Sequence, residues 1–419
     1  MRYFEMKEEL LERFLRYAAV TSQSNAKAGT VPSSPGQRRL AELLAAELGE
    51  IGFQKIEISE YSVLTAFLPG NLPDNRAVPT VGWVAHLDTV DAGLSPDVHP
   101  QVIRGYQGGD ICLNAEKNLW MRKAEHPEVE DYIGDDLVVT DGTSVLGADN
   151  KSAIANVMTA FTRIVKENRP HGDIYLAFVP DEEIGLCGAK KMDFSKFPVD
   201  FAYTIDCCAL GEVVYQTFNA GGATISIKGV TAHPMSSKGV LVNPTLIATD
   251  FVQMMDRTAT PECTEGTEGF IWVNSIVSSP ARATVSIKIR DHNRAKYEEK
   301  KATIARAVEY LKTRYPRAEI ELTMSDVYGN IEDALTDENR ASIDMLYRAL
   351  EIEGVEPKTI AMRGGTDGSY ISTQGIITPN YFTGALNFHS SCEFMPLSAV
   401  EKSTQVTLAL VDLIAGTKH

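Results

Sequence analysis

Residues 80–88 of the chain read TVGWVAHLD, six uncharged residues that run directly into His86 and Asp88. A run that is apolar on both of its faces is typical of a central strand in a sheet that helices cover on both sides. Residues 174–179 and 201–205 have the same character. Because predicted helices alternate with predicted strands, the sequence favours an α/β fold with a mixed, mostly parallel sheet flanked by helices.

The helices expected around this sheet show the apolar period of an amphipathic helix. In the helix expected at residues 5–19, Leu10, Leu11, Phe14 and Leu15 fall on one face. Further helices are expected at residues 37–48, 152–165, 341–354 and 399–415, and strands of alternating character at residues 56–58 and 63–67. These elements supply both layers of the predicted fold.

The pattern of the sequence changes near Glu212. Residues 223–229 and 283–289 alternate strictly between apolar and polar side chains, as half-exposed antiparallel strands do. Two helices and a last strand are expected at residues 244–255, 294–315 and 318–322. We therefore predict a smaller α+β domain inserted into the first. The larger domain would comprise residues 1–214 and 323–419, and the insert residues 215–322.

Length and charge limit the classes of function. A chain of 419 residues exceeds one ordinary hydrophobic core, which agrees with two domains. Its 40 basic and 56 acidic side chains give a formal charge of −16. This balance argues against nucleic acid as a partner, since phosphates require a basic surface, and against an anionic membrane surface.

The cysteines and the N-terminal residues indicate a cytoplasmic protein. The six cysteines include no CxxC pair, which argues against a zinc ribbon or a thioredoxin-like site and suits a reducing compartment. Glu5, Glu8 and Glu9 interrupt the region where a signal peptide needs an apolar run. No stretch reaches the roughly 18–20 apolar residues of a membrane-spanning helix.

Residues that can bind metal stand at the carboxyl ends of the predicted strands, or in the loops beside them. Ligands bind at this edge of open α/β sheets, so segments scattered along the sequence should converge there. Imidazole and carboxylate groups together suit Zn²⁺ and related divalent ions, and one carboxylate can bridge two ions. The residues concerned are His86, Asp88, Asp149, Glu182, Glu183, Asp206 and His389.

Each of these motifs has an ordinary structural interpretation when it is taken alone. A His-x-Asp sequence at a strand end is more often a turn, and an acidic triplet such as residues 181–183 is usually a solvated loop. Asp149 could simply cap the helix that follows it. The order and spacing of all the motifs together favour a metal site.

Three sequence blocks are similar to the signature blocks of the M20 zinc metallopeptidases. They are residues 83–89 (WVAHLDT), 146–151 (LGADNK) and 180–185 (PDEEIG). Residues 363–368 (RGGTDG) and 379–384 (PNYFTG) resemble more narrowly the peptidase T branch of that family, the tripeptide aminopeptidases. These blocks occur through most of the chain in the order of the family.

The resemblance implies a site for two zinc ions, for which Co²⁺ or Mn²⁺ could substitute. His86 and Asp206 would bind one ion, Glu183 and His389 the other, and Asp149 would bridge them. Glu182 would then be the general base and Asp88 would orient His86. The resemblance also implies a cis peptide bond after Asp149.

The predicted insert would act as a lid and a dimerisation domain in such a protein. His233 would stabilise the oxyanion, and Arg290 and Arg363 would hold the peptide. Without the resemblance, a His-Pro pair is often only a surface turn, and an arginine at a strand end is more often part of a surface ion pair. Dimeric relatives supply the histidine from the partner chain, which suggests a homodimer.

The function implied is release of the N-terminal residue from short peptides, above all tripeptides, by zinc-activated hydroxide. Other M20 activities are the alternatives: a dipeptidase, a carboxypeptidase or a deacylase of N-acyl amino acids. A non-catalytic binding protein on the same fold is disfavoured, because every ligand position and Glu182 carry competent side chains. Cys207 and Cys208 replace the small residues that usually follow Asp206 in the family, which leaves the exact peptide preference open.

Overall fold

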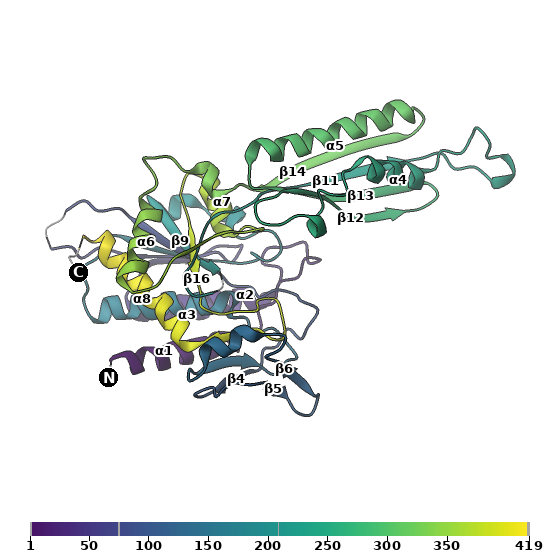
Figure 1. The fold of residues 1–419 in the computed structure, drawn as a ribbon. Helices are drawn as coiled ribbons and strands as arrows, with labels where there is room; N and C mark the ends of the chain where they lie inside the picture. Colours follow the sequence, from purple (N-terminus) through teal and green to yellow (C-terminus); the bar gives the residue numbers. More distant parts are fainter. Residues whose placement is uncertain (1, 74–75, 208, 417–419) are drawn as a thin grey trace. The chain divides into compact units, whose positions relative to one another are not determined.

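The computed structural model describes residues 2–73, 76–207 and 209–416, which form two compact units (Figure 1). Unit 1 contains the described residues up to Val214, then Leu335–Ile360 and the residues from Thr366 onward. Unit 2 contains Tyr215–Ala334 and Ala361–Gly365. Each unit has its own sheet and its own buried core.

An eight-stranded mixed sheet forms the centre of unit 1, which confirms the predicted α/β class. Its order is β1-β2-β8-β3-β9-β16-β10-β15. The four neighbours from β8 to β16 run parallel, whereas β1 pairs antiparallel with β2, β2 with β8, and β10 with β16. The bounds are β1 Gln54–Ile58, β2 Leu64–Leu68, β3 Val81–His86, β8 Ile174–Val179, β9 Phe201–Cys207, β10 Glu212–Gln216, β15 Lys358–Ala361 and β16 Asn380–Phe382.

Helices cover both faces of the parallel centre. Consecutive side chains of β3 point to opposite faces: Trp83 packs against Phe161 of α3, with ring centroids 5.2 Å apart, while Val84 shares a core with Ile371 of α7. This double burial explains the uninterrupted apolar run of β3. The helices are α1 Arg2–Ala18, α2 Pro35–Ile51, α3 Ala148–Lys166, α6 Ala341–Ile352, α7 Asp367–Thr373 and α8 Leu397–Ile414.

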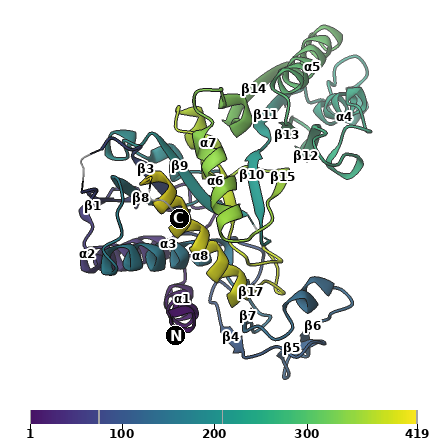
Figure 2. The same cartoon turned by 60° about the vertical axis from the view of Figure 1, so that its left-hand side comes forward.

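The segment of chain that connects β3 to α3 contributes strands to two small sheets of unit 1, which were not predicted from the sequence (Figure 2). One sheet has the order β17-β7-β4 and another pairs β5 with β6. One strand of the first sheet, β17, comes from far along the chain, where it immediately precedes α8. The bounds are β4 Pro100–Ile103, β5 Ile111–Asn114, β6 Leu119–Met121, β7 Leu137–Thr140 and β17 Phe394–Pro396.

Unit 2 is an antiparallel sheet of order β12-β13-β11-β14, with two helices packed against one face. Alternate residues of β11, among them Ala223, Ile225 and Ile227, are buried against those helices. The bounds are β11 Asn219–Lys228, β12 Phe270–Ser278, β13 Arg282–Asp291, β14 Glu319–Tyr328, α4 Pro244–Met254 and α5 Arg294–Arg314.

Two details of unit 2 differ from the expectation. Strand β12 was not predicted, because it is an edge strand whose residues are mostly half-buried or exposed and whose pairing is interrupted between Val273 and Ser275. Strand β14 continues to Tyr328, so the first segment of unit 2 extends past residue 322 to Ala334, and a second segment, Ala361–Gly365, joins it. Among the described helices, none is both long enough and apolar enough to cross a membrane.

Candidate metal centre

The parallel strands bring the predicted ligands to one edge of the sheet. His86 is the last residue of β3, Glu182 and Glu183 follow β8, and Asp206 lies near the end of β9. These three strands are neighbours and run parallel, so their carboxyl ends lie together. Asp149, in the first turn of α3, completes this group from outside the sheet.

Two groups of three potential ligands share the carboxylate of Asp149. In the first group, His86 Nε2 lies 2.9 Å from Asp149 Oδ1 and 3.6 Å from Asp206 Oδ1. In the second, His389 Nε2 lies 3.1 Å from Asp149 Oδ2 and 2.9 Å from Glu183 Oε1. One oxygen of Asp149 therefore faces each group, which is the arrangement that a bridging carboxylate requires.

Asp88 joins His86 to the acidic loop. His86 Nδ1 lies 3.0 Å from the main-chain oxygen of Asp88 and 3.4 Å from its carboxylate, so in the matching tautomer Nδ1 carries the proton and Nε2 the lone pair. The Asp88 carboxylate accepts hydrogen bonds from the main-chain N–H groups of Glu182 and Glu183, at 3.0 and 3.2 Å. Asp88 thus fixes two parts of the site at once.

The donor set fits divalent cations. His86 Nε2 points toward carboxylate oxygens of Asp149 and Asp206, so a proton or a cation must lie between them. His389 Nε2 likewise faces carboxylate oxygens of Asp149 and Glu183, and Glu183 Oε1 is buried. Imidazole and carboxylate are ligands that suit zinc.

The ionisation of these groups reflects their crowding. Burial disfavours the charge of Asp149, but hydrogen bonds from His389 and then His86 outweigh it and hold the pKa of Asp149 well below its usual range. Interactions with Asp149 and then Glu183 raise the pKa of His389 to about 10. Burial, followed by the charge of Asp149, raises the pKa of Glu183 to about 7. Protons or metal ions must therefore supply positive charge here.

Glu182 lies beside these two groups, and its carboxylate is not a member of either. One of its oxygens lies within 4.8 Å of ligand atoms of His86 and Glu183. Among the described residues, none donates a hydrogen bond to this carboxylate. Burial, followed by the charge of Asp206, raises the pKa of Glu182 well above its ordinary value. A carboxylate in this state can take up a proton from a nearby group.

Glu393 is a member of the site that the sequence analysis missed. It is buried, and its carboxylate accepts hydrogen bonds from the main-chain N–H groups of Leu146, Gly147 and Asp149, at 2.7, 2.9 and 3.1 Å. Burial is the main cause that raises the pKa of Glu393 to about 7. In the sequence, only its position four residues after the predicted ligand His389 could have suggested that Glu393 belongs to the site, and that spacing does not indicate which groups it contacts.

Asn150 and Asp367 were missed as well. Asn150 Nδ2 donates to Asp206 Oδ1 at 2.8 Å, and the Asp149–Asn150 peptide bond is cis, as the resemblance implied. Asp367 begins α7 inside the quoted block 363–368. Its side chain is buried, and its Oδ1 atom has no hydrogen-bond partner among the described residues.

The other predicted site residues belong to unit 2. His233 is exposed, and its Nδ1 accepts a hydrogen bond from Met235 N at 3.2 Å. Arg290 donates to the main-chain oxygens of Gly221 and Ile289, at 2.9 and 2.8 Å. Arg363 donates to two main-chain oxygens, to Glu268 O at 2.8 Å and to Gly266 O at 3.2 Å. Both guanidinium groups thus have partners within unit 2.

Of the two cysteines that follow Asp206, a predicted ligand, the described residues include one. Cys207 is buried and its thiol contacts the main-chain oxygen of Glu212 at 3.6 Å. Cys208 lies outside the described residues.

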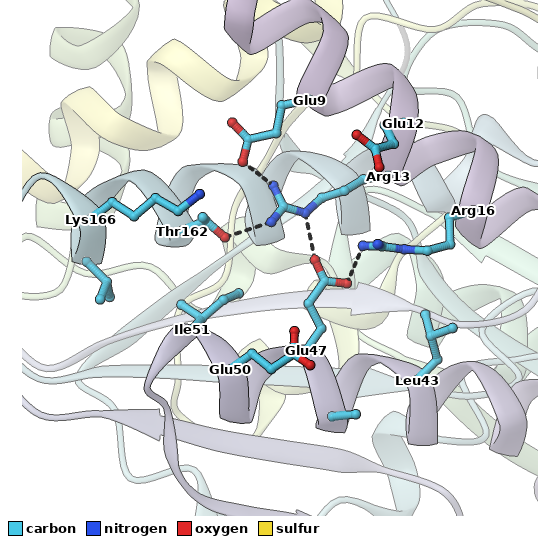
Figure 3. Close-up of a pocket in the computed structure, with 12 residues that line it drawn as sticks. Glu9, Glu12, Arg13, Arg16, Leu43, Glu47, Glu50, Ile51, Thr162 and Lys166 are labelled. Carbon is cyan, nitrogen blue, oxygen red and sulfur yellow. Dashed lines mark hydrogen bonds and ion pairs between the residues drawn. The ribbon is translucent and has the colours of Figure 1, made fainter.

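A separate cavity of about 760 Å³ lies among α1, α2 and α3 (Figure 3), and none of the residues that line it is a predicted ligand.

Comparison with known proteins gives consistent matches. Residues 146–413 match the model of peptidase family M20/M25/M40. A peptidase T-like protein of Rhizobium meliloti is 50% identical over 410 residues, which are 98% of this chain and 99% of that protein. Peptidase T of Bacillus licheniformis is 40% identical over 409 residues, which are 97% of this chain and 99% of the relative.

Solved structures agree in fold. The crystal structure of a tripeptidase from Staphylococcus aureus superimposes with a TM-score of 0.76 at 21% identity, covering 98% of this chain and 99% of that one. The structure of an aminopeptidase from Bacillus cereus gives a TM-score of 0.75 at 20% identity, with the same coverage. At these identities the likeness concerns the fold alone.

Proposed function

The chain belongs to peptidase family M20/M25/M40, and from this we propose that it is a two-zinc aminopeptidase that removes the N-terminal residue from short peptides, above all tripeptides. The observation that carries the proposal is the pair of ligand groups that share Asp149, with the free carboxylate of Glu182 beside them. Names of relatives support the peptide class: proteins about 40% identical are peptidase T, and those 50% identical are peptidase T-like.

In this proposal His86 and Asp206 hold one ion, Glu183 and His389 hold the other, and Asp149 bridges them. Zinc bound there would lower the pKa of a water molecule to about 7 and polarise the scissile carbonyl group. Glu182 accepts the proton of the attacking water and returns it to the leaving amine. Its position within 4.8 Å of ligand atoms of His86 and Glu183 supports this role.

Unit 2 would supply the remaining groups. We assign stabilisation of the oxyanion to His233 and binding of the peptide to Arg290 and Arg363. The exposed imidazole of His233 has one ring nitrogen that the contact with Met235 leaves available. Further parts of the proposal are a homodimer, in which each partner lends His233 to the other, and a cytoplasmic location, which the cysteine usage favours.

A panel of peptides tests the specificity. The zinc-loaded protein is incubated with di-, tri- and tetrapeptides and with their N-acetylated forms, and products are identified by mass spectrometry. We expect release of the N-terminal residue from tripeptides, no reaction with acetylated peptides, and loss of all activity after chelation. Release of the C-terminal residue would identify a carboxypeptidase, hydrolysis of N-acyl amino acids a deacylase, and cleavage confined to dipeptides a dipeptidase. Each of these results would contradict the proposal.

A further inference from the structure

We propose that Gln37 and Ser33, at the start of α2, are positioning residues that set where the carboxylates of Glu182 and Glu183 stand in the metal centre. The inference rests on the proposed function and extends it to two side chains outside the ligand set. They act through Asp181, the first residue of the acidic triplet, whose carboxylate is bound by Ser33 and Gln37 and is not among the ligand groups.

Asp181 is held by four hydrogen bonds from this one segment. Its carboxylate is fully buried and accepts from Ser33 N at 2.7 Å, from Ser33 Oγ at 2.5 Å and from Gln37 Nε2 at 2.7 Å. Its own main-chain N–H donates to Gln37 Oε1 at 2.9 Å. The single side-chain amide of Gln37, which is buried as well, therefore contacts both the main chain and the side chain of Asp181.

The contacts matter because of the backbone they hold. Asp181 has a φ of +58°, a left-handed conformation that few residues other than glycine adopt, and such conformations persist only where surrounding contacts enforce them. Three consecutive N–H groups of the loop are bound by side chains from elsewhere. Gln37 takes that of Asp181, and Asp88 takes those of Glu182 and Glu183. Gln37 and Asp88 thus fix both ends of the turn that aims the two glutamates.

The chemistry of the pair allows a reciprocal exchange. Both partners of Asp181 are uncharged, so Gln37 and Asp181 form a pair of one amide and one carboxylate that face each other. Gln37→Glu places a carboxylate oxygen against Asp181 Oδ1 and removes a donor. Adding Asp181→Asn restores one amide facing one carboxylate with the same total charge, now in the opposite order. Ser33 N can still donate to the amide oxygen that this second change introduces.

Two measurements test the inference: binding of Zn²⁺ to the metal-free protein, titrated against a chromogenic chelator, and steady-state kinetics of the zinc-loaded protein. For Gln37→Glu we expect the affinity for at least one ion, or kcat, to fall by about 10–100-fold, the effect typical of residues that orient ligands, with KM little changed. Ser33→Ala removes one donor, so its loss should be smaller, and it replaces Gln37→Glu in the test if that variant does not fold. The double variant Gln37→Glu/Asp181→Asn should recover most of the zinc affinity or kcat that Gln37→Glu loses.

A matched control separates positioning from general destabilisation. Leu44→Ala, in the buried face of the same helix, should lower the melting temperature while leaving zinc affinity and kcat near those of the unchanged protein. Unchanged zinc affinity and kcat in Gln37→Glu would overturn the inference. A double variant whose zinc affinity and kcat are no higher than those of Gln37→Glu would overturn it as well. If the unchanged protein binds two ions but cleaves no peptide, the proposed function fails, while the comparison of zinc affinities still decides the role of Gln37.

Discussion

Glu182 and Glu183 are neighbours in the sequence whose carboxylates meet different surroundings. Glu183 Oε1 lies 2.9 Å from His389 Nε2, in the group that also contains Asp149, whereas the carboxylate of Glu182 accepts no hydrogen bond from the described residues. Asp88 holds the main-chain N–H groups of both. Because the two neighbouring side chains leave the turn toward different groups, one glutamate can bind metal while the other carries a proton.

The corresponding prediction compares two nearly isosteric changes. Glu182→Gln keeps every proposed ligand, so the protein should still bind two ions, while turnover falls by the ~10²–10⁴-fold that loss of a general base produces. Glu183→Gln should instead leave the protein with one tightly bound ion. Metal analysis and peptide hydrolysis measured on the same samples distinguish the two. Full turnover in Glu182→Gln would exclude its role as base.

At the scale of elements, a buried guanidinium joins three helices of unit 1. Arg13 of α1 donates to Glu47 of α2 at 2.7 Å and to Thr162 of α3 at 2.9 Å (Figure 3). It also donates to Thr159 of α3 at 3.0 Å. A fourth contact, at 2.6 Å, goes to Glu9 one turn earlier in α1. The planar fork of arginine matches several acceptors at once, which a lysine cannot do. The contact ties α1 and α2 to α3, whose first turn carries Asp149.

Removing this guanidinium should destabilise the fold. We expect Arg13→Leu to lower the free energy of unfolding by roughly 1.5–3 kcal/mol, the range for lost hydrogen bonds to charged groups, as measured by urea denaturation. Arg16→Leu is the control, because its side chain is 44% exposed and exposed ion pairs contribute at most about 1 kcal/mol. Equal losses in the two variants would mean that the contacts of Arg13 contribute no more than an exposed pair.

At the scale of the whole molecule, the chain divides its chemistry between two units. All the proposed metal ligands and Glu182 belong to unit 1, while His233, Arg290 and Arg363 belong to unit 2. Under the proposed function, unit 1 would supply the metals and the general base, and unit 2 the groups that bind the peptide and the oxyanion.

Subunit mixing tests this division. His233→Ala should bind two ions normally but lose most of its turnover, because an oxyanion-stabilising group typically contributes about 10²–10³-fold. In the proposed homodimer, mixing His233→Ala chains with Glu182→Gln chains should restore part of the activity, since some sites then contain both groups. No recovery after verified subunit exchange would rule out a shared site. Normal turnover in His233→Ala alone would rule out a catalytic role for it.

The fold class and the candidate ligands could both be predicted from residue types and their spacing. Apolar runs such as residues 174–179 indicate buried parallel strands because burial on both faces leaves a local mark on composition. The histidine, aspartate and glutamate residues at the ends of those strands predicted a metal site, since few types of side chain bind zinc. The structure brings seven of the predicted residues together: the five ligands, Asp88 and Glu182.

The contacts that hold these groups in place could not be predicted in this way. Gln37 contacts Asp181 across 144 positions of sequence, and Glu393 contacts Asp149 across 244. Neither residue carries a local signature, because a buried glutamine or glutamate looks in sequence like any solvated polar residue. Edge strand β12 reads FIWVNSIVS, which is rich in β-branched and aromatic residues but lacks the strict alternation of β11 and β13, and only its pairing with β13 identifies it as a strand. Sequence records which side chains are chemically able to bind metal, whereas the hydrogen bonds that aim them exist only once distant segments have packed together.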